Sequence, residues 1–218
     1  AKELFGHIDR EVSHQVPNFS HGGFAIVGNV LTGQIQKPFA FFFRFGLGFG
    51  GGCLPKDIRA FMARAGELGA DEALMFLREV DQINLRRRTH TVDLARKVLG
   101  GEFVGKSVTV LGATFKPNSD DVRDSPSLDI AVAISNAGAK VKVHDPKGLV
   151  NAARVYPNMT YEQDVLNALD GADLIIHGTE WNEYRELDPA AVAKVVNSRH
   201  IIDGRNTLDP QAWRNAGF

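Results

Sequence analysis

Residues 107–111, Ser-Val-Thr-Val-Leu, decide the fold, because they form a short β-branched run that stops at Gly112. Three further runs of this kind follow at residues 140–144, 174–177 and 200–202, with helical patterns between them near 126–137, 161–169 and 189–196. Strands that alternate with helices are typical of a parallel sheet with helices on both faces. The sequence therefore predicts an α/β fold in which residues 104–218 form a doubly wound, Rossmann-like parallel-sheet domain.

Polar and charged residues cluster where these strands should end, at the edge of a doubly wound sheet where ligands bind. The segments concerned are residues 114–123, Asp145 and residues 203–206. Lys116, Arg123 and Arg205 are cations on these loops, and Ser125-Pro126 is a typical helix start. Taken singly, each cation also fits a surface ion pair. Taken together, they predict a pyrophosphate site to which the helix N-terminus contributes N–H donors.

Two helical patterns precede the sheet. From Asp57 to Ala70 apolar residues recur at helical spacing, with Gly69 as a stop. A second pattern runs without Pro or Gly from about Asp71 to Leu99. A helix of this length is longer than a small domain needs, so we expect it to span two domains or to pack against a second copy. Residues 86–88, three consecutive arginines, predict a solvated face of this helix.

The single cysteine of the chain lies in Gly48-Phe-Gly-Gly-Gly-Cys53-Leu-Pro-Lys-Asp57. Glycines before a thiol let backbone and a ligand approach it closely, and Pro55 suits the first turn of a helix. A thiol there would meet unpaired N–H groups, the positive end of the helix dipole and the Lys56 ammonium, all of which stabilise a thiolate. Cys53 is therefore a candidate nucleophile. The alternative is a small buried hydrophobic residue, the usual state of a lone cysteine.

Two other hypotheses concern the same region. Residues 46–51 match the dinucleotide-binding pattern G-x-G-x-x-G, but the stretch that follows is helical and offers no second strand to bring Asp71 to a ribose. We therefore expect no NAD fingerprint there. A cysteine hydrolase would need a histidine base, and no histidine lies near Cys53 in the sequence, although one can approach it in space.

Residues 1–45 carry the weakest patterns, because glycines and prolines interrupt them. Only residues 24–27 and 39–45 resemble short strands. His7, His14 and His21 are evenly spaced, but Pro17 lies between two of them and disfavours a continuous helix. Structural zinc usually takes closer pairs or thiolates, so no metal site is expected.

Composition excludes several classes of partner. Lys and Arg total 25 against 26 Asp and Glu, so no strong charge favours nucleic acid or an anionic membrane. No apolar run approaches the ~20 residues that span a bilayer. One cysteine cannot form an internal disulfide, and no signal sequence is recognisable, which favours a cytoplasmic enzyme that binds a small molecule.

Four blocks in a fixed order carry a family resemblance. They are residues 48–57, GATFKPNSDDVRDSP at 112–126, ADLIIHGTEW at 172–181 and IDGRN at 202–206. From about Gly46 to the end, the chain resembles the nucleotide-sugar dehydrogenases of the UDP-glucose/GDP-mannose dehydrogenase family. The resemblance is poor before Gly46.

The resemblance implies an NAD-dependent, two-step oxidation of the C6 alcohol of UDP-glucose to UDP-glucuronate. The cysteine holds the intermediate aldehyde as a thiohemiacetal, which is oxidised to a thioester that water cleaves. By position, Cys53 matches the nucleophile and Asp57 the carboxylate that helps to activate water. The other matches are Phe49 and Gly50 in the loop over the sugar, Phe115, Lys116 and Arg205 as substrate contacts, and Arg123 as a contact near the NAD phosphates.

The chain also departs from the family pattern. The family's N-terminal Rossmann domain and the helix that supplies a catalytic lysine and asparagine have no counterpart in it. We therefore expect the substrate-binding C-terminal portion of a longer enzyme: a poorly matching segment, 1–45; the cysteine loop with central dimerisation helices, 46–103; and a UDP-binding domain, 104–218. A homodimer through the 72–99 helix is implied. The alternatives are a dehydrogenase of GDP-mannose or another nucleotide sugar, and a non-catalytic UDP-sugar-binding or dimerisation module.

Overall fold

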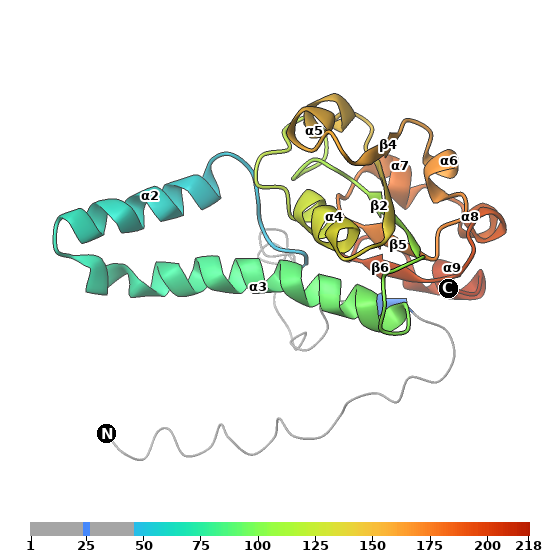
Figure 1. The fold of residues 1–218 in the computed structure, drawn as a ribbon, viewed down its shortest axis with the longest axis horizontal. Helices are drawn as coiled ribbons and strands as arrows, with labels where there is room; N and C mark the ends of the chain where they lie inside the picture. Colours follow the sequence, from blue (N-terminus) through green and yellow to red (C-terminus); the bar gives the residue numbers. More distant parts are fainter. Residues whose placement is uncertain (1–23, 27–45) are drawn as a thin grey trace, which may run out of the picture.

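The computed structural model describes residues 24–26 and 46–218, which form a parallel sheet, two layers of helices and a projecting helix pair (Figure 1). The strands are β1 (Phe24–Ile26), β2 (Ser107–Leu111), β3 (Lys140–His144), β4 (Thr160–Glu162), β5 (Leu174–His177) and β6 (Ile201–Asp203). Their order is β1-β6-β5-β2-β3-β4, and every neighbouring pair is parallel. The chain changes direction across the sheet between β2 and β5, which confirms the predicted doubly wound fold.

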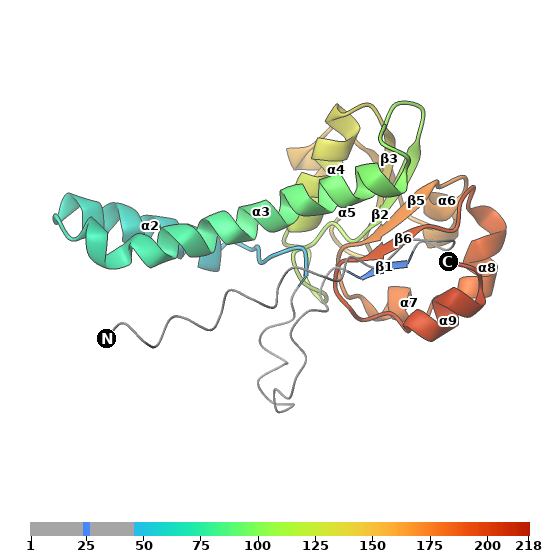
Figure 2. The same ribbon diagram turned by 90° about the horizontal axis from the view of Figure 1, so that it is seen from below.

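Helices cover both faces of the sheet (Figure 2). They are α2 (Leu54–Glu67), the 3₁₀ turn η1 (Asp71–Leu74), α3 (Met75–Val98), α4 (Pro126–Asn136), α5 (Leu149–Val155), α6 (Val165–Leu169), α7 (Asn182–Arg185), α8 (Pro189–Val195) and α9 (Pro210–Asn215). Side chains alternate along each strand, so Leu174 and Ile176 join the core under α3 and α4, whereas Ile175 joins the core under α6–α9. Both faces of the central strands are buried, as parallel sheets require.

The short elements differ from the sequence expectation. The segment near 161–169, expected to be one helix, contains β4 and then α6, and β6 begins at Ile201 rather than at His200. Helices α5, α7 and α9 were not predicted. All of these elements span seven residues or fewer, so too few turns exist for a helical period to emerge from the sequence.

The helix pair α2–α3 projects beyond the sheet domain (Figures 1 and 2). The long helix predicted from about Asp71 begins instead at Met75, after the 3₁₀ turn, and the C-terminal half of α3 packs against α4. Among the described residues, no helix combines the length and the apolar character needed to cross a membrane. The strand expected at 24–27 is present as β1, which pairs with β6. The strand expected at 39–45 and the three N-terminal histidines lie outside the described residues.

Candidate active site

Cys53 lies at the start of a helix, as predicted from the sequence. It occupies the N-cap position of α2, and its carbonyl oxygen accepts a hydrogen bond of 2.8 Å from the N–H of Asp57. Pro55 stands in the first turn and is buried, whereas Cys53 itself is exposed. The sulfur is therefore accessible, and the alternative of a buried hydrophobic cysteine is wrong.

The segment before it, residues 46–53, is called the cysteine loop. A methyl group at Gly50 would lie 2.1 Å from the carbonyl oxygen of Asp124, and one at Gly52 would lie 2.3 Å from the guanidinium carbon of Arg123. Such distances are far below van der Waals contact, so Gly50 admits no side chain beside the fixed backbone of Asp124, whereas a side chain at Gly52 would displace the exposed guanidinium of Arg123. We expected these glycines to admit a ligand, but the structure shows the chain's own β2–α4 loop, residues 112–125, filling that space.

Arg123 is the cation next to the cysteine loop. Its guanidinium forms two hydrogen bonds to Asp121, of 2.9 and 2.7 Å, and its side chain is 71% exposed. The hydrogen bond and charge of Asp121 raise the pKa of Arg123, and the same hydrogen bond lowers the pKa of Asp121. The carbonyl oxygen of Arg123 also accepts a hydrogen bond from the N–H of Gly51. Arg123 is thus held beside Cys53 with its charge facing solvent.

Arg205 joins three loops at the carboxyl edge of the sheet. Its guanidinium donates to the carbonyl oxygens of Gly178 (2.7 Å), Gly48 (3.4 Å) and Phe115 (3.5 Å), and it pairs with Glu180 at 3.3 Å. The side chain is only 13% exposed, and burial lowers the pKa of Arg205. Arg205 therefore fastens the cysteine loop to the end of β5 and to the β2–α4 loop.

The remaining sequence-derived candidates are more exposed. Lys116 extends over the ring of Phe115, with its nitrogen 5.3 Å from the ring centroid. Asp57 lies one helical turn after Cys53, and its carboxylate pairs with Lys56 at 3.1 Å across a solvent-exposed surface. Such exposed pairs contribute little to stability. Both Lys116 and Asp57 are therefore free to contact a ligand at small cost.

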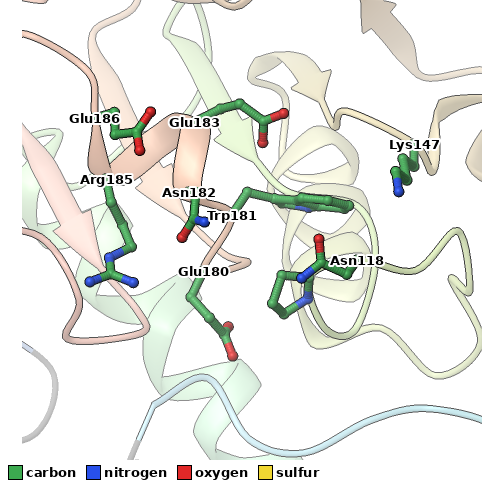
Figure 3. A pocket seen from close by; sticks show the side chains of 9 residues that line it. Asn118, Lys147, Glu180, Trp181, Asn182, Glu183, Arg185 and Glu186 are labelled. Atoms are coloured by element: carbon green, nitrogen blue, oxygen red, sulfur yellow. The ribbon is translucent and has the colours of Figure 1, made fainter.

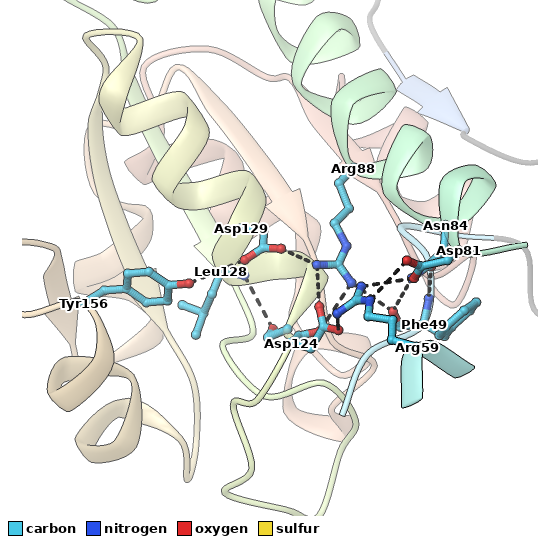
Figure 4. A network of polar contacts seen from close by, with 10 residues as sticks. Phe49, Arg59, Asp81, Asn84, Arg88, Asp124, Leu128, Asp129 and Tyr156 are labelled. Atoms are coloured by element: carbon cyan, nitrogen blue, oxygen red, sulfur yellow. Dashed lines mark hydrogen bonds and ion pairs between the residues drawn. The ribbon is translucent and has the colours of Figure 1, made fainter. Parts of the chain in front are cut away.

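A buried polar network behind the cysteine loop was not foreseen (Figure 4). Arg88 on α3 pairs with Asp124 at 2.7 Å and with Asp129, and it donates to the carbonyl oxygen of Phe49 at 3.1 Å. The Asn84 side chain bonds both backbone groups of Phe49. The network links α3, the cysteine loop and the start of α4.

The prediction of a solvated face at residues 86–88 is therefore wrong for two of the three arginines. Arg88 is buried, and Arg87 donates to the carbonyl oxygen of Gly46 at 3.1 Å. Only Arg86 is exposed, where it pairs with Glu79. A signal was present in the sequence, because Asn84, Arg88 and the buried Ala95 recur at helical spacing on one face.

Asp145, at the end of β3, was expected among ligand-binding residues, but it organises the loops instead. Its buried carboxylate accepts hydrogen bonds from the N–H groups of Ala113 (2.8 Å) and Gly148 (2.7 Å) and from Nε1 of Trp181 (3.1 Å). One carboxylate thus ties together the loops that follow β2, β3 and β5.

A cavity of about 760 Å³ opens beside these loops (Figure 3). It lies between Asn118 of the β2–α4 loop, Lys147 after β3, and the segment from Glu180 to Glu186. A second cavity, of about 530 Å³, is lined by Arg123, Asn151 and Arg154. In the part of the chain that the structure describes, no three His, Cys, Asp or Glu side chains gather as metal ligands would.

The fold and site define a doubly wound α/β domain, a class that typically binds nucleotides at its strand ends, joined to a helix pair that presents an exposed cysteine beside the strand-end loops. Two family models match the chain: the UDP-binding domain of the UDP-glucose/GDP-mannose dehydrogenase family over residues 109–210, and the central domain of the same family over residues 25–86. The chain belongs to the UDP-glucose/GDP-mannose dehydrogenase family.

Individual relatives agree with this assignment. The UDP-glucose 6-dehydrogenase of Rickettsia conorii is 36% identical over 179 residues, which cover 81% of this chain and 41% of that protein. A solved UDP-glucose dehydrogenase from the archaeon Pyrobaculum islandicum is similar with a TM-score of 0.66 and 36% identity, over 74% of this chain and 35% of that one. A solved GDP-mannose dehydrogenase from Pseudomonas aeruginosa is similar with a TM-score of 0.63 and 25% identity, over 78% of this chain and 39% of that one. The chain thus spans less than half the length of these relatives.

Proposed function

We propose that this chain carries the thiol and the nucleotide-sugar-binding parts of an enzyme that uses NAD to oxidise UDP-glucose to UDP-glucuronate. The observation that carries the proposal is the position of Cys53. Its sulfur is exposed at the start of α2, and the loop that presents it touches Arg123, Phe115 and Arg205 at the carboxyl edge of the sheet. That edge is where doubly wound sheets bind nucleotides.

In this scheme Lys116 and Phe115 hold the nucleotide sugar so that C6 lies at Cys53, and Arg205 acts by holding the loops that carry these residues and Cys53 together. The thiolate adds to the C6 aldehyde, a sulfur–carbon bond forms, and the aldehyde oxygen takes a proton to give a thiohemiacetal. Once this adduct has been oxidised to a thioester, water adds at C6 and the carbon–sulfur bond breaks, which releases the uronate and restores the thiolate. Asp57, one turn along α2, takes the proton from the attacking water.

NAD, when bound, supplies the hydride acceptor for both oxidations. The described residues fit its phosphate groups. Arg123 has an exposed guanidinium beside the cysteine loop and lines a cavity together with Arg154, so it can hold a phosphate group. Residues 46–51 do not fit as a dinucleotide cradle, because Gly204, Asn84 and the β2–α4 loop occupy the space beside their glycines.

The helix pair supports a homodimer. Large apolar side chains of α2 and α3 and of the turn between them are exposed, among them Phe61 (58%), Leu68 (67%) and Phe76 (61%). Large apolar side chains that gather on one exposed part of a protein typically mark an interface. A second copy of the chain would cover it. We also propose a cytoplasmic location, since a reactive thiol is kept reduced there.

Isothermal titration calorimetry with UDP-glucose and GDP-mannose tests the proposal. We expect UDP-glucose to bind and Lys116→Ala to weaken binding about tenfold, the effect of losing one charge-assisted hydrogen bond. Lys140→Ala, which alters an exposed lysine at the opposite end of β3, is the matched control and should bind normally. Absence of UDP-glucose binding would contradict the proposal, and preference for GDP-mannose would favour that sugar as the substrate.

The cysteine hydrolase hypothesis finds no support in the described histidines nearest the strand ends. His144 shares a hydrogen bond with Tyr184, and His177 with Asp203, all of them buried. Burial also lowers the pKa of His144. Neither imidazole is available to an exposed thiol.

A further inference from the structure

Asn84 holds the cysteine loop by both backbone groups of a single residue (Figure 4). The N–H of Phe49 donates to Oδ1 of Asn84 at 2.7 Å, and Nδ2 of Asn84 donates to the carbonyl oxygen of Phe49 at 3.0 Å. The side chain is buried, with 3% of the residue exposed. A carboxamide carries one acceptor and two donors, so it can pair with a peptide group in this way, whereas an apolar side chain cannot.

The cysteine loop is shaped to receive this side chain. A methyl group at Gly48 would lie 2.4 Å from Oδ1 of Asn84, and the φ angle of Gly48 is +105°. Both facts require glycine at this position. The fit therefore involves the loop as well as the helix.

Arg88, one helical turn after Asn84, continues the contact toward the nucleotide-binding edge. It donates to the same Phe49 oxygen and pairs with Asp124 of the β2–α4 loop and with Asp129 of α4. The carbonyl oxygen of Asp124 in turn occupies the space that a side chain at Gly50 would need. One face of α3 thus connects the loop that carries Cys53 with the loop that carries Lys116 and Arg123.

From this geometry we infer that Asn84 is a positioning residue. It holds the Phe49 peptide and thereby fixes the Cys53 thiol relative to the β2–α4 loop. The inference rests on the proposed function of the cysteine site. Asn84 makes no contact with the sulfur and acts through Phe49. Capture of a sugar carbon by a thiol requires a fixed geometry, and small displacements at a reacting centre cost large factors in rate.

The test compares Asn84→Leu with Gln82→Leu in this chain. Leucine has the same branching of heavy atoms as asparagine, although it is larger, and it suits a helix, so Asn84→Leu removes both hydrogen bonds without adding a charge near Arg88. Gln82 is exposed on the same helix and provides the matched control. The readouts are the rate at which iodoacetamide alkylates Cys53, with and without saturating UDP-glucose, and the affinity for UDP by calorimetry.

In the unaltered chain and in Gln82→Leu we expect UDP-glucose to slow alkylation about tenfold, because sugar and thiol share one site. In Asn84→Leu we expect this protection to fall to about twofold or less while the UDP affinity stays within about twofold, since the nucleotide contacts are intact. Hydrogen exchange at the Phe49 amide should be faster in Asn84→Leu only.

Full protection in a folded Asn84→Leu protein would overturn the inference. If that variant does not fold, Asn84→Ala is measured in the same way, and protection retained in it has the same meaning. Loss of both hydrogen bonds without faster exchange at Phe49 would also overturn it. Failure of the proposed function is a different result: UDP-glucose would then neither bind nor protect the unaltered chain.

Discussion

The two halves of α3 have opposite surfaces. The segment from Asp81 to Val98, here called the polar half, faces the rest of the chain and buries Asp81, Asn84, Arg88 and Thr91. The first turns, residues 75–80, here called the apolar half, project beyond the domain and expose Met75 and Phe76. A simple amphipathic rule would bury the apolar residues and expose the polar ones. The inversion shows that each half is shaped by what it contacts: the polar half holds the cysteine loop, and the apolar half forms the surface that the proposed dimer would cover.

The largest effect should come from removing the central cation of the polar half. Arg88→Ala leaves Asp124, Asp129 and the Phe49 oxygen without this partner. We expect the free energy of unfolding to fall by about 2–4 kcal/mol, which is less than a fully buried ion pair would cost, because both carboxylates are partly exposed to water. Urea unfolding followed by circular dichroism measures it. Arg86→Ala, on the exposed side, should cost less than about 0.5 kcal/mol. Equal losses in the two variants would show that the comparison is wrong.

Substitutions in the apolar half should change the affinity between two copies of the chain rather than the stability of the fold. Phe76→Glu is expected to weaken a dimer by about 2 kcal/mol or more, because it places a charge in the proposed interface, while unfolding of the sheet domain stays unchanged. Sedimentation equilibrium measures the association. The control is Val150→Glu, at a valine of α5 that is 65% exposed. A purely monomeric unaltered chain would refute the proposed role of this face.

Alanine substitutions at a glycine of the cysteine loop and at a glycine of the projecting helix α2 should change the stability in opposite directions. Gly50→Ala forces a methyl group against the Asp124 carbonyl, and we expect a loss of about 1–2 kcal/mol together with faster proteolysis of the cysteine loop. Gly66 lies in α2 with no atom near its missing side chain, so Gly66→Ala should add about 0.5–1 kcal/mol. Thermal unfolding of both variants checks the pair. A stabilising Gly50→Ala would mean that the loop is not packed as described.

The smallest effect concerns pH. Burial alone would raise the pKa of Asp203, but hydrogen bonds from His177 and from backbone N–H groups outweigh it and hold the pKa below its ordinary value. The stability that Asp203 contributes is therefore present above the ordinary Asp pKa and is lost as the pH falls through the lowered one. We expect a loss of about 1 kcal/mol on acidification that Asp203→Asn lacks. The measurement is urea unfolding over a series of acidic pH values, and an acid slope in Asp203→Asn identical to that of the unaltered chain would contradict the assignment.

Sequence patterns predicted the elements that are long or strongly apolar. Strands β2, β3 and β5 have the expected bounds, because each is a buried β-branched run that ends at a polar or glycine residue. The capping pair Ser125-Pro126 begins α4 as expected. The start of α2 at the cysteine was also predictable, since Pro55 marks a first turn.

The sequence did not predict what depends on contacts between distant segments. The glycines of the cysteine loop indicated a close approach but not its partner, which is the β2–α4 loop more than sixty residues away. Arg88 and Asn84 carry polar side chains, and their burial depends on Asp124 and Phe49, which only the fold brings to α3. Roles of Cys53, Asp57, Lys116 and Arg123 in binding and chemistry stay predictions.

The central claim is that the cysteine loop and the nucleotide-binding edge form one site. Mass spectrometry of Cys53 alkylation in the unaltered chain, with UDP-glucose or with UDP alone, tests it most directly. The account predicts that UDP-glucose slows modification markedly and that UDP, which lacks the sugar, slows it much less. If both ligands bind and neither changes the rate, the thiol does not face the sugar, and the account is wrong.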